Sequence, residues 1–166
     1  MAEFKSISPD AVPLALEKAE RYRLLNEPHE AESICRDILE VDPANRQARI
    51  SLVLALTDEI PHESGAFTSA MEAMSGLETE YDRSYYSGIA WERRAKASYA
   101  AGGVGSGGYV YDWTIRALQL FGAAEHLRPA GNDDAILRWN ACVRFLERHK
   151  ELRPKMEEAP EPILSE

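Results

Sequence analysis

Residues 117–129 read ALQLFGAAEHLRP and carry the clearest structural signal in the chain. Ala117, Phe121 and Ala124 recur at spacings of four and three residues, which places them on one face of an α-helix. Small side chains on such a face let a second helix approach closely, and the aromatic ring between them fills the interface. Pro129 cannot continue the helix because it lacks a backbone N–H. The stretch therefore predicts a helix that packs against a neighbour and ends just before Pro129.

A similar pattern occurs earlier in the chain, where residues 31–43 read AESICRDILEVDP. The spacing of the apolar residues and of the final proline is the same, although Cys35 stands where the later stretch has an aromatic residue. Two short strings, Pro28-His29-Glu30 and Pro61-His62-Glu63, lie 33 residues apart, and each is expected to open a helix. A fixed period of this length indicates a helical repeat.

Working outward from these repeats, we expect an all-α fold with about seven helices. Apolar residues recur at helical spacing from Asp10 onward, and no stretch alternates apolar and polar residues for long enough to predict a strand. Asp10 and Asn45 are expected to be helix N-caps, because their short polar side chains can accept a hydrogen bond from the first turn. The expected helices are residues 10–25, 28–41, 46–60, 63–77, 82–101, 109–127 and 132–152.

Helix pairs with this period resemble tetratricopeptide repeats, whose pattern places small residues where paired helices touch and a proline at the end of the repeat. The resemblance covers residues 10–152 and implies about three repeats followed by a C-terminal capping helix, arranged as a right-handed superhelix of antiparallel pairs. The middle repeat matches least well, because Val53 stands where glycine or alanine is usual. The residues that match in the first and third repeats are Ala15, Ala19, Tyr22, Ala31, Cys35, Ile38 and Pro43, then Ala117, Phe121, Ala124 and Pro129.

Three further segments flank or interrupt the helical domain. Residues 1–9 form an N-terminal segment, and residues 153–166 form an acidic, proline-rich tail that is expected to be disordered because it lacks apolar content. Between the fifth and sixth helices the family usually has a turn of two or three residues, but this chain has the glycine-rich stretch Gly102–Gly108. We expect a loosened or projecting hairpin there.

Composition excludes several classes of function. The 166-residue chain has 28 acidic and 19 basic side chains and a formal net charge of -9, which disfavours nucleic acid as a partner. No apolar run reaches the roughly 18 residues that a membrane span needs, and the N-terminus has no apolar signal region. With only two cysteines, Cys35 and Cys142, we expect a protein of the reducing cytoplasm.

No motif predicts catalysis, a cofactor or a metal. Gly103, Gly105 and Gly108 satisfy G-x-G-x-x-G, but a helix rather than a strand precedes them, so we interpret the stretch as a linker. The four histidines lack the spacing of a zinc site, and His29 and His62 are expected to be exposed residues at the starts of helices. Both cysteines lie on apolar helix faces, where a thiol is not activated. The sequence therefore predicts no catalytic residue, no cofactor and no metal ligand.

In tetratricopeptide proteins the leading helix of each pair lines a concave groove that binds a segment of another protein. Three of the implied groove residues, Arg93, Lys96 and Arg138, would attract a carboxylate or an acidic peptide, unless they only form ion pairs on a solvated helix face. The chaperone-binding members of the family need lysine and asparagine on the first leading helix, where this chain has Leu16 and Glu20, so that role is not implied. The full set of implied groove residues is Glu20, Arg23, Ser51, Leu54, Arg93, Lys96, Tyr99 and Arg138.

The resemblance implies a non-enzymatic adaptor or chaperone-like scaffold that binds a peptide segment of a partner protein. Two alternatives stay open. Stretch 102–108 could act as a lid over an aromatic pocket in a small-ligand-binding protein or enzyme. Alternatively, the concentration of aromatic residues between Tyr85 and Trp113 could drive self-association.

Overall fold

The computed structural model describes residues 2–104, 106–152 and 154, and all regular secondary structure in these residues is helical. The described residues form seven α-helices and one 3₁₀ turn, so the predicted all-α class is confirmed. The proline-rich tail predicted for residues 153–166 lies, apart from Pro154, outside the described residues. The elements are η1 Pro9–Ala11, α1 Val12–Leu24, α2 Pro28–Val41, α3 Arg46–Asp58, α4 Ala66–Met74, α5 Glu80–Ala101, α6 Ser106–Leu127 and α7 Asp134–Arg148.

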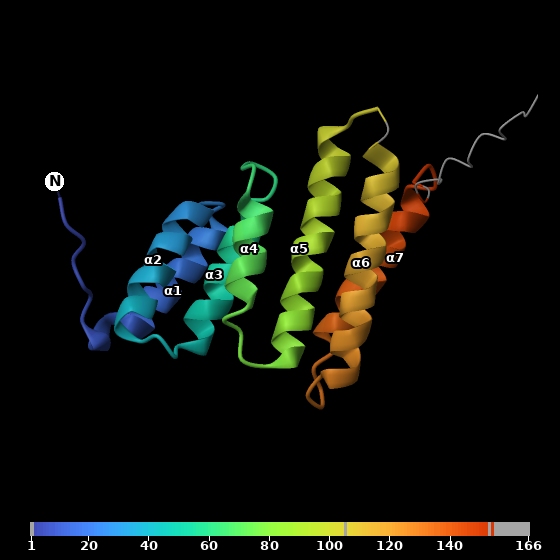
Figure 1. Ribbon diagram of the computed structural model, residues 1–166. Coiled ribbons are helices and arrows are strands. Elements are labelled where there is room, and N and C mark those ends of the chain that lie inside the picture. The colour runs from blue at the N-terminus through green and yellow to red at the C-terminus, as the bar shows by residue number, and fades with distance from the viewer. Residues whose placement is uncertain (1, 105, 153, 155–166) are drawn as a thin grey trace, which may run out of the picture.

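The helices form three antiparallel pairs, α1 with α2, α3 with α4 and α5 with α6, and α7 packs on the last pair (Figure 1). The first helices of successive pairs also contact one another, since α1 packs on α3 and α3 on α5. This side-by-side stacking of helix pairs is that of an α-solenoid. None of the helices in the described part of the chain combines the length and the apolar character needed to cross a membrane.

Polar caps define several helix ends. The Asn45 side chain accepts a hydrogen bond from the Ala48 N–H at 2.9 Å, as predicted for the start of α3. Thr79 caps α5 in the same way through the Asp82 N–H, also at 2.9 Å. The prediction for Asp10 was wrong: Asp10 lies inside the 3₁₀ turn η1, and α1 begins after Ala11 without a side-chain cap. A 3₁₀ turn before α1 therefore takes the place of a capping side chain.

The segment 61–63 does not open a helix, contrary to the sequence prediction. The N–H groups of His62 and Glu63 donate to the Glu59 carbonyl at 2.8 and 3.0 Å, so this segment closes the end of α3 instead. The chain then turns at Gly65, whose φ of 98° is a left-handed conformation that favours glycine, and α4 begins at Ala66. As a result α4 has only nine residues, whereas α5 has 22.

The glycine-rich stretch is also shorter than predicted, because α6 begins at Ser106 and includes Gly107 and Gly108. Gly102 and Gly103 have φ values of 68° and 143°, and they carry the chain from α5 into this connection. The wrong prediction has a simple cause. Glycine is a poor helix former, but tertiary packing overrides this weak preference when a long helix continues beyond it.

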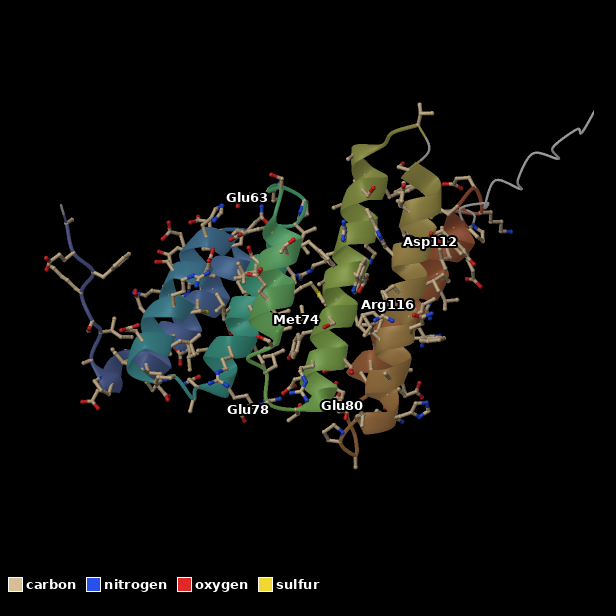
Figure 2. The ribbon with its side chains drawn as sticks, in the orientation of Figure 1. Glu63, Met74, Glu78, Glu80, Asp112 and Arg116 are labelled. Carbon is tan, nitrogen blue, oxygen red and sulfur yellow. The ribbon has the colours of Figure 1, made fainter. Side chains whose placement is uncertain are left out.

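The interface between α5 and α6 is the most extensive helix–helix interface among the described residues. Ala117, Phe121 and Ala124 are fully buried, as the opening stretch predicted. Gly88 of α5 lies against the Phe121 ring, and a Cβ atom at Gly88 would be only 2.6 Å from Phe121 Cε1. On the other side of α5, the Ser87 hydroxyl donates to Met74 Sδ of α4 at 3.1 Å, and Figure 2 shows Met74 directed toward α5.

Substitution of Gly88→Ala should destabilise the protein by about 1–3 kcal/mol, because the added methyl group would overpack the Phe121 ring. Chemical denaturation measures this difference. Gly107→Ala is the matched control: its Cβ would lie 3.7 Å from the nearest side-chain atom, an ordinary contact, and alanine favours the helix. Equal stability of the two variants would contradict the assigned α5–α6 packing.

Cys35 and Cys142 are both free and buried. Burial is the main cause that raises the pKa of each thiol to about 12. The buried thiols are therefore poor nucleophiles in the folded protein.

The native protein should therefore react very slowly with dithionitrobenzoate at pH 8, because neither thiol is exposed or ionised. Both should react rapidly after unfolding in guanidinium, and absorbance of the released thiolate measures the two rates. Fast modification of either cysteine in the native state would mean that its helix face is open to solvent.

Candidate functional site

The predicted groove residues, except Arg138 of α7, come from the leading helices, and their charges form ion pairs within the chain. Asp58, at the end of α3, accepts a hydrogen bond from Arg23 Nε of α1 at 2.8 Å and forms an ion pair with Arg93 Nη1 of α5 at 2.6 Å. Arg93 also donates to the Thr57 hydroxyl and, at 3.2 Å, to the Leu54 carbonyl. Burial lowers the pKa of Arg93, although the charge of Asp58 acts in the opposite direction. One carboxylate thus joins three helices.

A second carboxylate joins α5 to α7. Glu92 is 2% exposed and pairs with Lys96, one turn further along α5, and with Arg138 Nη1 of α7 at 3.3 Å. The four cations predicted for the groove, Arg23, Arg93, Lys96 and Arg138, therefore each have a carboxylate partner in the fold. Their positive charges stabilise the packing of the leading helices, and a partner would have to compete with an internal carboxylate for each of them.

The structure separates the remaining predicted groove residues. Ser51 is buried, and Leu54 packs against the core cluster around Ile89. Glu20 is exposed and lies 3.4 Å from Arg23. Tyr99 lies near the end of α7, where its hydroxyl is 2.8 Å from His149 Nδ1 and donates to Glu151 Oε1 at 3.1 Å. A shallow hollow of about 350 Å³ borders Asp58, Arg93 and Lys96, so part of the predicted groove exists as an open surface.

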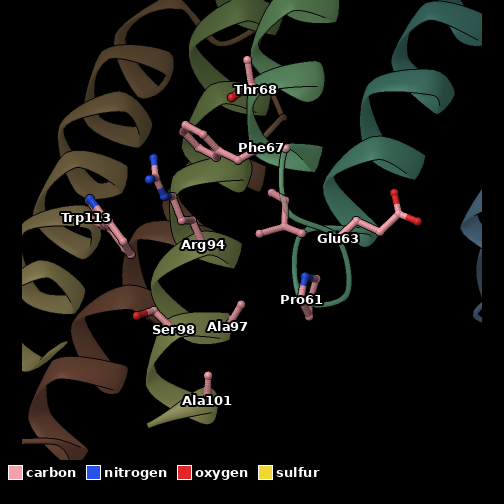
Figure 3. Close-up of a pocket in the computed structure, with 11 residues that line it drawn as sticks. Pro61, Glu63, Phe67, Thr68, Arg94, Ala97, Ser98, Ala101 and Trp113 are labelled. Carbon is pink, nitrogen blue, oxygen red and sulfur yellow. The ribbon is translucent and has the colours of Figure 1, made fainter. Parts of the chain in front are cut away.

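A larger cleft of about 490 Å³ lies between α4 and the second half of α5 (Figure 3). The mismatch in helix length creates it. At about 1.5 Å per residue, the nine residues of α4 span roughly 13 Å and the 22 residues of α5 roughly 33 Å, so α4 cannot cover its neighbour. The connection between α3 and α4 forms one wall, and Trp113 of α6 lies opposite. The side chains at its centre are Phe67, Arg94 and Trp113.

Arg94 is the chemically distinctive residue of this cleft. Its guanidinium carbon lies 4.3 Å from the Phe67 ring centre, 4.2 Å from the Trp113 ring centre and 5.4 Å from the Trp91 ring centre. Among the described residues, Arg94 has no ion pair with a carboxylate. Aromatic rings interact with the faces of a guanidinium group and leave its N–H edge for hydrogen bonds.

Sequence reasoning did not find Arg94. The spacing of Trp91 and Arg94 by three residues on one helix would have predicted their contact. The contributions of Phe67 and Trp113 depend on how α4 and α6 pack on α5, which no local pattern reveals. Trp91 and Trp113 are both half-buried beside this cleft.

The two alternative functions depend on other residues. None of the glycines at positions 102, 103, 107 and 108 lines the cleft at Arg94, so the structure gives no support to a lid over it. Of the aromatic residues proposed for self-association, Tyr85, Tyr86 and Trp91 pack against the core, while Tyr99 and Tyr109 are partly exposed. The comparisons with known proteins add nothing to this choice, since no family model, curated protein or solved structure matches the chain.

The ion pairs of Glu92 generate a stability prediction. Glu92→Gln should destabilise the protein by about 2–3 kcal/mol, because it removes the buried charge that Lys96 and Arg138 share. Glu125→Gln is the control, since its pair with Arg128 is longer, at 3.7 Å, and exposed, and should contribute less than about 1 kcal/mol. Urea denaturation measures the free energy of unfolding of both variants. Equal losses of this free energy would show that the ion pairs of Glu92 do not stabilise the fold.

Proposed function

We propose that the chain is a non-enzymatic, tetratricopeptide-like binding module that holds a segment of a partner protein in the cleft at Arg94. The observation that supports this proposal is a guanidinium group held between Phe67 and Trp113 that has no carboxylate partner within the described part of the chain. The segment it fits carries an aspartate or glutamate next to an apolar side chain. The concave groove is a weaker candidate because its cations already have internal partners.

The chemistry of the cleft matches that of protein-binding hot spots. Arginine and tryptophan are enriched among residues that contribute most to binding, especially in pockets from which water is excluded. The planar guanidinium group can donate two parallel hydrogen bonds to one carboxylate, and stacking on the aromatic rings limits the side-chain entropy lost on binding. An adjacent apolar side chain of the partner would cover Phe67 and Trp113 and remove their surface from water.

The charge around the cleft favours short-range recognition. Glu63 also borders it, but Figure 3 shows this side chain directed away from Arg94, and its Oε1 atom lies 3.1 Å from His29 Nε2. The net charge of -9 gives no long-range attraction for an acidic segment, so affinity would depend on contacts inside the cleft. The two unpaired thiols fit the proposal of a cytoplasmic adaptor.

Selection from a displayed peptide library on the full-length protein tests this function. We expect enriched peptides to carry an acidic residue beside an apolar one. Their affinity should fall at least about tenfold for Arg94→Gln, which removes the charge, and partially for Arg94→Lys, which keeps the charge but loses the planar fork. Isothermal titration measures these affinities.

The control for that experiment is Arg116→Gln, because Arg116 is an exposed residue of α6 that does not line the cleft and whose Nη1 atom donates to Gln119 Oε1 at 3.2 Å. Its peptide affinity should equal that of the wild type. Enriched peptides without an acidic residue, or peptide affinity that Arg94→Gln leaves unchanged, would contradict the proposal. Binding of free carboxylic acids as tight as that of the peptides would favour a small-ligand site instead.

A further inference from the structure

The connection between α3 and α4 lies against the start of α2 and gathers three potential metal ligands. His29 is the second residue of α2, Glu59 follows the last residue of α3, and Glu63 lies one turn beyond Glu59. His29 Nδ1 is 3.1 Å from Glu59 Oε1, and His29 Nε2 is 3.1 Å from Glu63 Oε1. One potential ligand atom from each residue lies within 4.8 Å of the other two.

Within this cluster, ordinary packing does not explain the burial of the Glu59 carboxylate. It is only 3% exposed, and its Oε1 atom is buried without a hydrogen-bond donor of suitable geometry. It also follows the C-terminal end of α3, where the helix dipole disfavours a negative charge. Burial is the main cause that raises the pKa of Glu59, and the nearby charge of Glu32 acts in the same direction. A buried carboxylate in this setting needs a cation.

We propose that His29, Glu59 and Glu63 bind one divalent transition-metal ion of the zinc class. An imidazole nitrogen with two carboxylate oxygens is a donor set that suits Zn²⁺ better than Mg²⁺, which prefers oxygen ligands alone. The side chains of His29 and Glu63 are 61% and 49% exposed, so both can rotate to complete the coordination. Glu59 is held in place by burial and would define the position of the ion.

The location of the three ligands suggests what the ion would do. Glu59 and Glu63 belong to the connection that forms one wall of the cleft at Arg94, and His29 belongs to α2 of the preceding pair. A bound ion would therefore join the first helix pair to the second at this connection. This site stands on its own contacts and does not depend on peptide binding in the cleft.

The test is titration of Zn²⁺ into the full-length, chelator-treated protein by calorimetry, together with thermal unfolding. We expect one saturable site, and a rise in Tm of about 5–10 °C at a free Zn²⁺ concentration about 100-fold above Kd. His29→Ala and Glu63→Gln should each weaken binding at least about tenfold, while Mg²⁺ should give no rise in Tm. Circular dichroism checks that these exposed positions leave the fold intact.

His62→Ala is the matched control, because His62 is exposed on the same connection, next to Glu63, and lies outside the cluster. It should bind Zn²⁺ with wild-type affinity. The absence of saturable Zn²⁺ binding would overturn the proposal. So would equal Zn²⁺ affinity in His29→Ala and the wild type, or an equal loss of Zn²⁺ affinity in His29→Ala and His62→Ala.

Discussion

Asp58 accepts a hydrogen bond from Arg23 of α1 and forms an ion pair with Arg93 of α5, and the stacking of the first helices of successive pairs depends on this shared carboxylate. The three helices would otherwise place two cationic side chains side by side in a partly buried interface. Two cations around one anion are stable only if the carboxylate is fixed, and its place at the end of α3 fixes it. Glu92 repeats the arrangement between α5 and α7.

The ion pair with Asp58 gives two neighbouring arginines different roles. Arg93 points toward the leading helices and is held by Asp58, whereas Arg94, the next residue of α5, points into the cleft between α4 and α6. Consecutive residues of a helix differ in direction by about 100°, so one can serve packing while the other stays open to a partner. Charge alone does not distinguish them, because both are arginines on the same helix turn.

Much of the fold could be predicted because its determinants are local. The small and aromatic residues at 117, 121 and 124 occur at helical spacing, and Asn45 is a helix-capping residue directly before a helical pattern. The predictions for Asp10 and for residues 61–63 failed because more than one local structure suited those residues. A 3₁₀ turn replaced the expected cap, and hydrogen bonds to Glu59 completed α3 where a new helix was expected.

The candidate sites were less predictable, for a physical reason. The partners of Arg23, Arg93 and Arg138 are Asp58 and Glu92, and each of these three pairs connects residues at least 35 positions apart. The cluster of His29 with Glu59 and Glu63 likewise spans a whole repeat, so the search for local ligand spacing missed it. Helical periodicity places a residue on a face of its own helix, but the partner on that face is determined by the packing of helices.

The central claim is that Arg93 is structural and Arg94 is free to bind a partner. The most direct measurement is the free energy of unfolding of Arg93→Gln and Arg94→Gln, determined in urea under identical conditions. We predict a loss of about 2–3 kcal/mol for Arg93→Gln, which deprives the half-buried Asp58 of a partner, and at most about 1 kcal/mol for Arg94→Gln, which loses only stacking. Equal losses, or a larger loss for Arg94→Gln, would show that Arg94 also serves the fold and would contradict the account.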